Sequence, residues 1–159
     1  STLFPYTTLF RSPNIITSLE LDPAEMEKRN IHLQKKYAEI EENEVRFEEL
    51  HCEDAEYLIV AFGSCARIAQ KGMEMAREEG IKVGLLRPIT LWPFPSKAIA
   101  ARAAQVKGIL TVELNAGQMV EDVRLAVECK VPVEHFGRLG GIVPDPDEVI
   151  TALKEKLIK

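Results

Sequence analysis

The sequence predicts an α/β domain, a three-layer αβα sandwich with a mainly parallel sheet, between Tyr57 and Lys159. Two observations predict it. Short apolar runs alternate with helical patterns, and the first run, YLIVAF at Tyr57–Phe62, is apolar throughout, as in a strand that is buried on both faces. Alternation at this spacing produces right-handed βαβ units, whose sheet lies between two helix layers. A chain of 159 residues suits one such core.

The predicted elements follow one another in chain order. The four strands are expected at Tyr57–Phe62, Lys82–Leu86, Ile109–Leu114 and Val131–Phe136. Helices are expected between them at Cys65–Glu79, Ser96–Val106 and Gly117–Cys129, and a last helix follows the capping-box pattern of Asp145–Glu148. Pro132 indicates an edge strand or a strand start, because proline has no N–H to donate to a sheet.

Residues 13–56 before this domain read as a linker with a charged helix. Leu21–Asn43 begins with Asp22 as a cap and Pro23 at the first helical position. Met26, Asn30, Leu33, Tyr37 and Ile40 form one narrow stripe along the helix, whose apolar character Asn30 interrupts. The helix is either a solvated connection or a strap that docks on another subunit or on a preceding part of the protein. The acidic stretch after it suits an exposed connection that includes one edge strand.

The first twelve residues, Ser1–Ser12, have neither an amphipathic period nor turn signals. Their sequence, STLFPYTTLFRS, resembles the conceptual translation of a widely used DNA sequencing adapter. Residues 1–12 are therefore interpreted as an artefact and excluded from the fold prediction. On this interpretation the natural chain is cut at Pro13, and the sequence is a C-terminal piece of a longer protein.

Charge and composition argue against several classes of partner. The net charge is −5 with no basic patch, so neither nucleic acid nor an anionic membrane is expected as a partner. No apolar run approaches the roughly 20 residues of a membrane-spanning helix, and no secretory signal pattern is present. Three widely spaced cysteines without a C-x-x-C pair suit a reducing cytoplasm, and they predict no disulfide framework, zinc site or iron–sulfur cluster held by this chain alone.

Polar side chains and glycines are expected to gather at the carboxyl edge of the sheet, where open α/β proteins bind ligands and partners. The candidates at this edge are Ser64, Arg67, Arg87, Thr90, Trp92, Asn115, Gly117, Gln118 and Arg138. Arg87 directly follows a buried strand and must find a partner or solvent. Trp92, beside two prolines, suggests a rigid interface platform, and local packing of the loop explains it equally well.

None of these residues forms a recognisable catalytic or metal-binding pattern. Ser64 is typical of a plain helix cap and, more weakly, of an anion-binding helix start. Cys65 lies on the inner face of its helix and is expected to pack in the core, and His135 reads as a structural histidine in a strand. Neither G-x-G-x-x-G nor G-x-x-x-x-G-K-[ST] occurs. We therefore expect no catalytic, cofactor-binding or metal-binding residue in this chain.

Four stretches in chain order nevertheless carry a family resemblance. They are YLIVAFGSCARIA (Tyr57–Ala69), LRPITLWPFP (Leu86–Pro95), TVELNAGQMVEDVR (Thr111–Arg124) and HFGRLGG (His135–Gly141), with the linker LQKKYAEIEENEVRFEE (Leu33–Glu49). From about Pro13 to Lys159 the chain resembles the C-terminal domain of the alpha subunit of 2-oxoacid:ferredoxin oxidoreductases, most of all the type that acts on 2-oxoisovalerate (3-methyl-2-oxobutanoate). The resemblance implies a fold similar to the transketolase C-terminal domain.

The resemblance also implies an activity that this chain does not hold by itself. Members of the family decarboxylate a 2-oxoacid on thiamine diphosphate with Mg²⁺, pass electrons through iron–sulfur clusters to ferredoxin, and form an acyl-CoA. The diphosphate-binding domain and the clusters belong to partner subunits. This chain is then a cytoplasmic structural and assembly domain, inactive alone.

Two alternatives stay open at this stage. One is a stand-alone module that binds a small ligand or an anion through the helix start at Ser64 and through Arg138. The other is the last domain of another thiamine enzyme, such as a dehydrogenase E1 beta chain or 1-deoxyxylulose-5-phosphate synthase.

Overall fold

A computed structural model describes residues 19–158 of the chain. Two compact units meet in sequence between Glu39 and Ile40. The twelve residues interpreted as an artefact lie outside the described part. Helix α2 (Pro23–Asn43) starts as predicted, because Asp22 Oδ1 accepts the backbone N–H groups of Ala24 at 2.8 Å and Glu25 at 3.3 Å.

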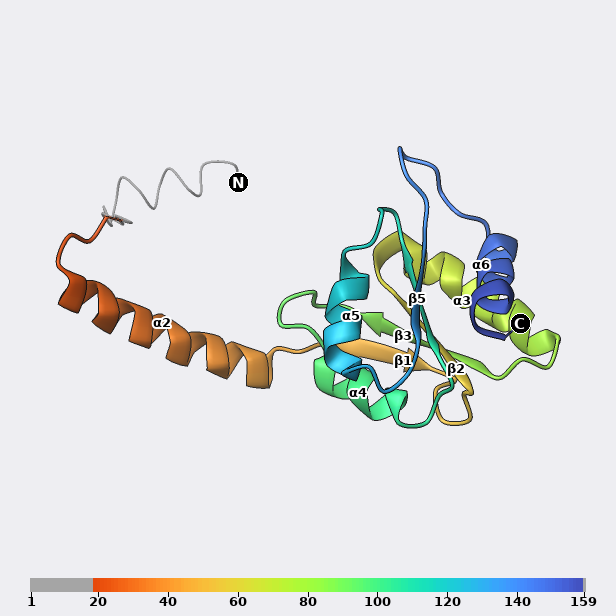
Figure 1. The fold of residues 1–159 in the computed structure, drawn as a ribbon, viewed down its shortest axis with the longest axis horizontal. Helices are drawn as coiled ribbons and strands as arrows, with labels where there is room; N and C mark the ends of the chain where they lie inside the picture. Colours follow the sequence, from red (N-terminus) through yellow and green to blue (C-terminus); the bar gives the residue numbers. More distant parts are fainter. Residues whose placement is uncertain (1–18, 159) are drawn as a thin grey trace, which may run out of the picture. The chain divides into compact units, whose positions relative to one another are not determined.

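The second unit is built on a five-stranded sheet (Figure 1). Its strands are β1 (Phe47–Leu50), β2 (Tyr57–Ala61), β3 (Val83–Pro88), β4 (Ile109–Glu113) and β5 (Val133–Gly137). They are ordered β1-β3-β2-β4-β5 across the sheet; β1 is antiparallel to β3, and all other neighbours are parallel. The mainly parallel sheet and its four predicted strands are confirmed. The acidic stretch supplies the edge strand β1, and Pro132 directly precedes the other edge strand, β5.

Helices cover both faces of the sheet. They are α3 (Gly63–Glu78), α4 (Ser96–Ala103), α5 (Met119–Val127) and α6 (Pro146–Leu153), which continues into the short π-helix η1 (Lys154–Ile158). Figure 1 shows α3 and α6 on one side of the strands and α4 and α5 on the other. The three-layer αβα sandwich is therefore confirmed, although the helix ends differ from the predicted ends by a few residues.

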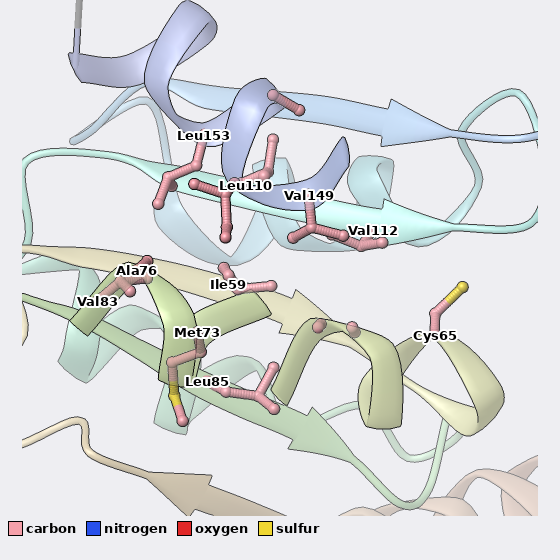
Figure 2. Packing of buried hydrophobic residues seen from close by; sticks show 14 of the residues in the cluster. Ile59, Cys65, Met73, Ala76, Val83, Leu85, Leu110, Val112, Val149 and Leu153 are labelled. Atoms are coloured by element: carbon pink, nitrogen blue, oxygen red, sulfur yellow. The ribbon is translucent and has the colours of Figure 1, made fainter. Parts of the chain in front are cut away.

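Two hydrophobic cores explain why the strand sequences are apolar without alternation. Ile59 and Ala61 of β2 point into the core beneath α3 and α6. Figure 2 shows Ile59 among the residues of this core. Leu58 and Val60 of the same strand point into the core beneath α4 and α5. Successive side chains of a strand face opposite sides, so a sheet covered on both faces needs apolar residues at every position. Cys65 is buried in the first core, as predicted.

A glycine sets the distance between α3 and α6. A Cβ atom built on Gly72 would lie 3.1 Å from Pro146 O and 3.3 Å from Val149 Cβ. The two helices therefore approach each other so closely at this point that even a methyl group on Gly72 would press on α6. The start of α6 is fixed by the contact expected of a capping box, in which the Asp145 N–H donates to Glu148 Oε2 at 3.1 Å.

Two arginines fasten β1 and the connection that follows it to the helices. Arg102 of α4 donates to both carboxylate oxygens of Glu49, at 2.9 and 2.6 Å. Arg77 of α3 donates to both oxygens of Asp54, at 2.7 Å each. The hydrogen bond from Arg102 lowers the pKa of Glu49 from its ordinary value. Such two-pronged pairs fix geometry as well as adding energy, so the acidic stretch that carries β1 is held in one place.

Candidate functional site

The register brings the loops after four strands and the start of a fifth to one edge of the sheet. β2, β3, β4 and β5 are parallel, so their carboxyl ends lie at the same edge. β1 is antiparallel to β3 and pairs Phe47 with Pro88, which places its first residue there as well. This is the carboxyl edge at which the candidate residues were expected.

Exposed large hydrophobic side chains concentrate at this edge. Among residues 40–158, they are Phe47, Ile89, Leu91, Trp92, Leu114, Leu139, Ile142 and Val143, each 39–58% exposed, and one outlier on α5, Leu125. We call the first eight residues the apolar rim. Such clustering of exposed apolar side chains is typical of an interaction surface rather than of ordinary solvent-facing surface.

Arg87 and Thr90 hold the rim in place from within the domain. Arg87 finds its partner on the neighbouring strand, where its Nη1 donates to Glu48 Oε2 at 2.9 Å. Thr90 Oγ1 accepts the Arg46 N–H at 3.0 Å and donates to Pro93 O at 2.8 Å. Arg87 thus ties the end of β3 to β1, and Thr90 ties the loop after β3 to the residue before β1. Trp92, in the same loop, is 56% exposed.

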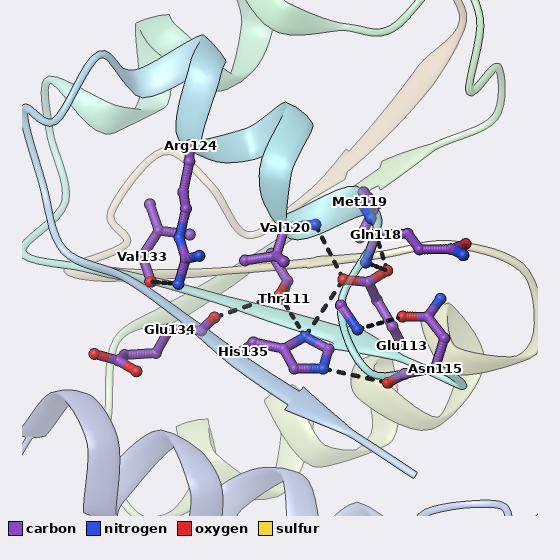
Figure 3. Close-up of polar contacts among 11 residues, drawn as sticks. Thr111, Glu113, Asn115, Gln118, Met119, Val120, Arg124, Val133, Glu134 and His135 are labelled. Carbon is purple, nitrogen blue, oxygen red and sulfur yellow. Dashed lines mark hydrogen bonds and ion pairs between the residues drawn. The ribbon is translucent and has the colours of Figure 1, made fainter. Parts of the chain in front are cut away.

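A buried carboxylate that the sequence reasoning missed lies beneath the loop after β4. Glu113 is 1% exposed. Its Oε2 accepts the N–H groups of Gln118 at 3.1 Å and Met119 at 2.8 Å, and its Oε1 accepts that of Val120 at 3.0 Å (Figure 3). These N–H groups belong to the start of α5. They have no acceptor within the helix, and the helix start carries partial positive charge. Glu113 therefore fills the position at which an external anion would bind this helix.

His135 supports the same loop from β5. Its Nδ1 lies 3.4 Å from Glu113 Oε1 and 3.2 Å from Thr111 Oγ1, and its Nε2 lies 3.3 Å from Asn115 O. Figure 3 shows the ring between the strand and the loop. The imidazole is engaged on both nitrogens by groups of its own fold, in line with the structural role predicted for it.

The loop after β4 is closed by its own predicted residues. Asn115 Oδ1 accepts the Gly117 N–H at 2.7 Å, and Gly117 adopts a φ of 110° that favours glycine. Gln118 donates its N–H to Glu113. A Cβ atom on Gly137 would lie 2.2 Å from Asn115 O, so only glycine permits this approach of β5 to the loop. Three candidates are thus brought together as one turn, with no catalytic arrangement among them.

The remaining candidates lie on other elements of the edge. Ser64 and Arg67 are exposed on the first turns of α3. Ser64 does not cap the helix, which corrects that expectation: Gly63 adopts a φ of 57° and turns the chain directly from β2 into α3, so the cap position falls on Phe62. Arg138 Nη2 lies 3.4 Å from Glu148 Oε1, and its Nε is buried without a hydrogen-bond partner.

Neither the thiols nor the hollows of residues 19–158 complete an active site at the edge. Burial raises the pKa of Cys52 to about 11 and also raises that of Cys65, so both are thiols at neutral pH.

One hollow of about 690 Å³ lies along α2, and another of about 340 Å³ lies at the amino end of β5. In the described residues no group of three or more His, Cys, Asp or Glu side chains is arranged to hold a metal ion. No helix in that range is long and apolar enough to cross a membrane.

Comparison with known families assigns the domain. Residues 55–149 match the family model of the pyruvate:ferredoxin oxidoreductase core domain II. The chain belongs to this family. Its core domain II thus contains all of the sheet except β1, together with helices α3 to α5 and the first turn of α6.

Relatives of this core domain II are subunits of 2-oxoacid oxidoreductases. Ketoisovalerate oxidoreductase subunit VorB of Methanothermobacter marburgensis is 46% identical over 142 residues, which cover 89% of this chain and 40% of the relative. The VorB subunit of Methanothermobacter thermautotrophicus is 48% identical over 142 residues, which again cover 89% of this chain and 40% of the relative. The chain therefore spans about two fifths of the length of these relatives. 2-Oxoglutarate synthase subunit KorA of Methanothermobacter marburgensis is 32% identical over 101 residues, or 64% of this chain and 27% of the relative.

Solved structures agree with the assignment of core domain II. The 2-oxoglutarate:ferredoxin oxidoreductase from Magnetococcus marinus superposes with a TM-score of 0.77 at 25% identity, over 91% of this chain and 27% of that chain. A split-gene transketolase superposes with a TM-score of 0.61 at 20% identity, over 71% of this chain and 41% of that chain. The second likeness concerns the fold alone, and it confirms the predicted similarity to transketolase-like domains.

Proposed function

We propose that the chain is the C-terminal structural and assembly domain of the alpha subunit of a thiamine-dependent 2-oxoacid:ferredoxin oxidoreductase. The whole complex would decarboxylate 3-methyl-2-oxobutanoate oxidatively, form the acyl-CoA and reduce ferredoxin in the cytoplasm. The match to two ketoisovalerate oxidoreductase subunits, at 46% and 48% identity, supports this substrate. Thiamine diphosphate, Mg²⁺, the iron–sulfur clusters and CoA would be held outside this chain, in part by a diphosphate-binding subunit and an iron–sulfur subunit.

The apolar rim is the observation that carries the assembly role. It is built from the loops after three strands and from the start of β1, so its residues gather at one edge of the sheet. Arg87 and Thr90 tie the rim loop to the sheet from within the domain. A set of exposed apolar side chains that includes a tryptophan has the composition of the buried part of an interface. We therefore assign the rim to contact with a neighbouring domain or subunit of the complex.

The structure weighs against a stand-alone anion-binding module. Glu113 already satisfies the start of α5 with three hydrogen bonds. Arg138 faces Glu148, so its charge is partly balanced within the fold. The start of α3 has no side-chain cap, but a helix start without further groups is a weak anion site.

Purification of the complete complex tests the proposed activity. The subunit that contains this chain is co-expressed with its neighbouring subunits, and CoA-dependent ferredoxin reduction is measured with 3-methyl-2-oxobutanoate, pyruvate and 2-oxoglutarate. We expect 3-methyl-2-oxobutanoate to have the highest kcat/KM. A complex that prefers either other acid would refute the substrate, and a complex with no activity on any of them would refute the enzyme class.

A further inference from the structure

The four helix starts at the carboxyl edge are of two kinds. α3, α4, α5 and α6 follow β2, β3, β4 and β5 in turn, so all four begin at this edge. Glu113 accepts the first N–H groups of α5, and Asp145 and Glu148 form a capping box on α6. The starts of α3 and α4 have no side-chain cap. The edge after β4 and β5 is therefore satisfied from within the fold, and the edge after β2 and β3 is not.

Charged residues divide the edge in the same way. α5 and α6 carry acidic residues in their first turns, where the partial positive charge of a helix start favours them. α3 and α4 have no acidic residue in the first turn, and Arg67 and Lys97 are instead exposed on the first two turns of these helices. A cation at this end of a helix is opposed by the helix dipole. The stability of α3 and α4 therefore does not explain Arg67 and Lys97.

Arg67 and Lys97 also differ from the other basic residues of the edge in having no counter-ion. Arg46, Arg87 and Arg138 each have a carboxylate oxygen within 2.9–3.4 Å. Within residues 19–158 the side chains of Arg67 and Lys97 take part in no hydrogen bond or ion pair. We call the edge after β2 and β3, with these two residues, the cationic side.

The cationic side also carries half of the apolar rim. Ile89, Leu91 and Trp92 follow β3, and Phe47 begins the neighbouring strand β1. β2 and β3 are neighbours in the sheet, but α3 and α4 lie on opposite faces of it (Figure 1). A partner that meets both cations therefore reaches over the edge from one helix layer to the other and covers the apolar side chains of this side. An interface of the usual size, about 800 Å² on each partner, is wide enough.

We propose that the cationic side binds an acidic and apolar surface of a neighbouring subunit, with carboxylates of that subunit on Arg67 and Lys97 and its apolar side chains on the loop that contains Trp92. The inference rests on the proposed assembly role and adds the chemistry of the partner. Opposite charges across an interface steer association and fix its orientation. Steering acts on chains that meet by diffusion, so the partner is assigned to another subunit rather than to a further part of the same chain.

Cross-linking with a carbodiimide identifies the partner directly. The reagent joins a lysine amine to a carboxylate in contact with it as an amide, and it takes up the water that is lost as a urea. The complete complex is cross-linked, and the joined peptides are identified by mass spectrometry. Lys97 reports its own contact, and the conservative variant Arg67→Lys reports the other. Lys82, an exposed residue just before β3 at the opposite edge, is the control.

We expect Lys97 and the lysine of Arg67→Lys to be joined to aspartate or glutamate of another subunit, and Lys82 not to be. Two outcomes would overturn the inference. One is that both lysines are joined only to carboxylates of this chain's own subunit, in the same copy or a second copy. The other is that neither lysine is joined to anything.

Charge reversal tests the same contacts without a reagent. Arg67→Glu with Lys97→Glu places acidic residues at the starts of α3 and α4, so the melting temperature of the subunit without its partners should stay the same or rise. Association with the partner subunits should weaken at least about tenfold, because like charges across an interface oppose binding. Lys82→Glu with Lys156→Glu makes the same change in net charge on exposed residues away from this edge and should leave association unchanged. Equal weakening by the two double variants would reveal a general effect of net charge and overturn the inference.

The apolar variant Trp92→Asp separates a failure of this inference from a failure of the proposed function. If Trp92→Asp prevents assembly and the reversal of Arg67 and Lys97 does not, the acidic partner is wrong and the assembly role stands. If neither change affects assembly, both are wrong.

Discussion

Glu113 and His135 lie on neighbouring parallel strands, with Glu113 Oε1 3.4 Å from His135 Nδ1. The carboxylate also receives three backbone N–H groups from the start of α5. A buried charge is tolerated only where it is fully hydrogen-bonded, and here the fold supplies the bonds. The pair joins β4, β5 and α5 into one unit, and it is this unit that shapes the middle of the carboxyl edge.

Loss of the Glu113 charge is expected to destabilise the domain. Glu113→Gln keeps the shape of the side chain but turns an N–H donor toward the N–H groups of α5. Bonds to charged groups contribute more than neutral ones, and an unsatisfied buried donor has its own cost, so we expect a loss of about 2–4 kcal/mol. Urea unfolding measures it. Glu121→Gln, an exposed change in the same helix, should cost less than about 1 kcal/mol, and equal losses for the two variants would contradict this role for Glu113.

The close approach at Gly137 makes a separate prediction. A Cβ atom there would lie 2.2 Å from Asn115 O and 2.7 Å from His135 Nε2. Gly137→Ala must therefore displace backbone, and we expect a loss of about 2–3 kcal/mol. Gly140→Ala is the control, since Gly140 has open space around it but a φ of 65°, which costs about 1–2 kcal/mol for an L residue. Thermal unfolding of the two variants should rank them in this order, and the reverse order would show that the contact is relieved easily.

The Arg102–Glu49 pair predicts a pH-dependent contribution to stability. Arg102 lowers the pKa of Glu49 from the ordinary 4.5. A lowered folded-state pKa gives stability that is complete above pH 4.5 and is lost as the pH falls through the folded-state value. We expect Arg102→Gln to cost about 1 kcal/mol at pH 7 once solvent screening is allowed for. The difference between the variant and the parent should shrink below pH 4.5.

An exposed ion pair of the same domain serves as the comparison. Lys107 and Glu56 form a contact whose side chains are 64% and 43% exposed, and Lys107→Gln should change stability little at any pH. Urea titrations of both variants between pH 3 and pH 7 give the answer. An Arg102→Gln deficit that stays constant down to pH 3 would mean that the pair contributes through packing rather than through charge.

Much of the fold was predictable because its signals are local. Tyr57–Phe62 is apolar at every position, which only a sheet covered on both faces requires. Asp22 and Asp145 marked helix starts that the structure confirms. The strand β1 was harder to place, because FEEL has two adjacent charged residues and is held by partners far away in the sequence.

The site was less predictable because its key contacts join distant residues. Arg87 required a partner, but its identity as Glu48 follows only from the antiparallel register of β1 and β3. Glu113 could have been found from the sequence. It is a carboxylate at the end of a buried strand, and it stands five residues before Gln118, whose N–H at the start of a helix it accepts. Gly63, rather than Ser64, sets the turn into α3, because backbone conformation overrode the capping preference of serine.

The assembly role of the apolar rim is tested most directly by placing a charge on it. Trp92→Asp and Leu139→Asp are compared with Leu125→Asp in the complete complex; all three residues are exposed, at 56%, 58% and 77%, but Leu125 lies outside the rim on α5. Thermal unfolding first verifies that each variant domain is folded. Size-exclusion chromatography with co-expressed partner subunits then measures assembly. We expect both rim variants to elute apart from their partners, since a charge in a hydrophobic interface costs at least about 2 kcal/mol, and Leu125→Asp to assemble normally. Normal assembly of both rim variants would contradict the assignment of this edge to an interface.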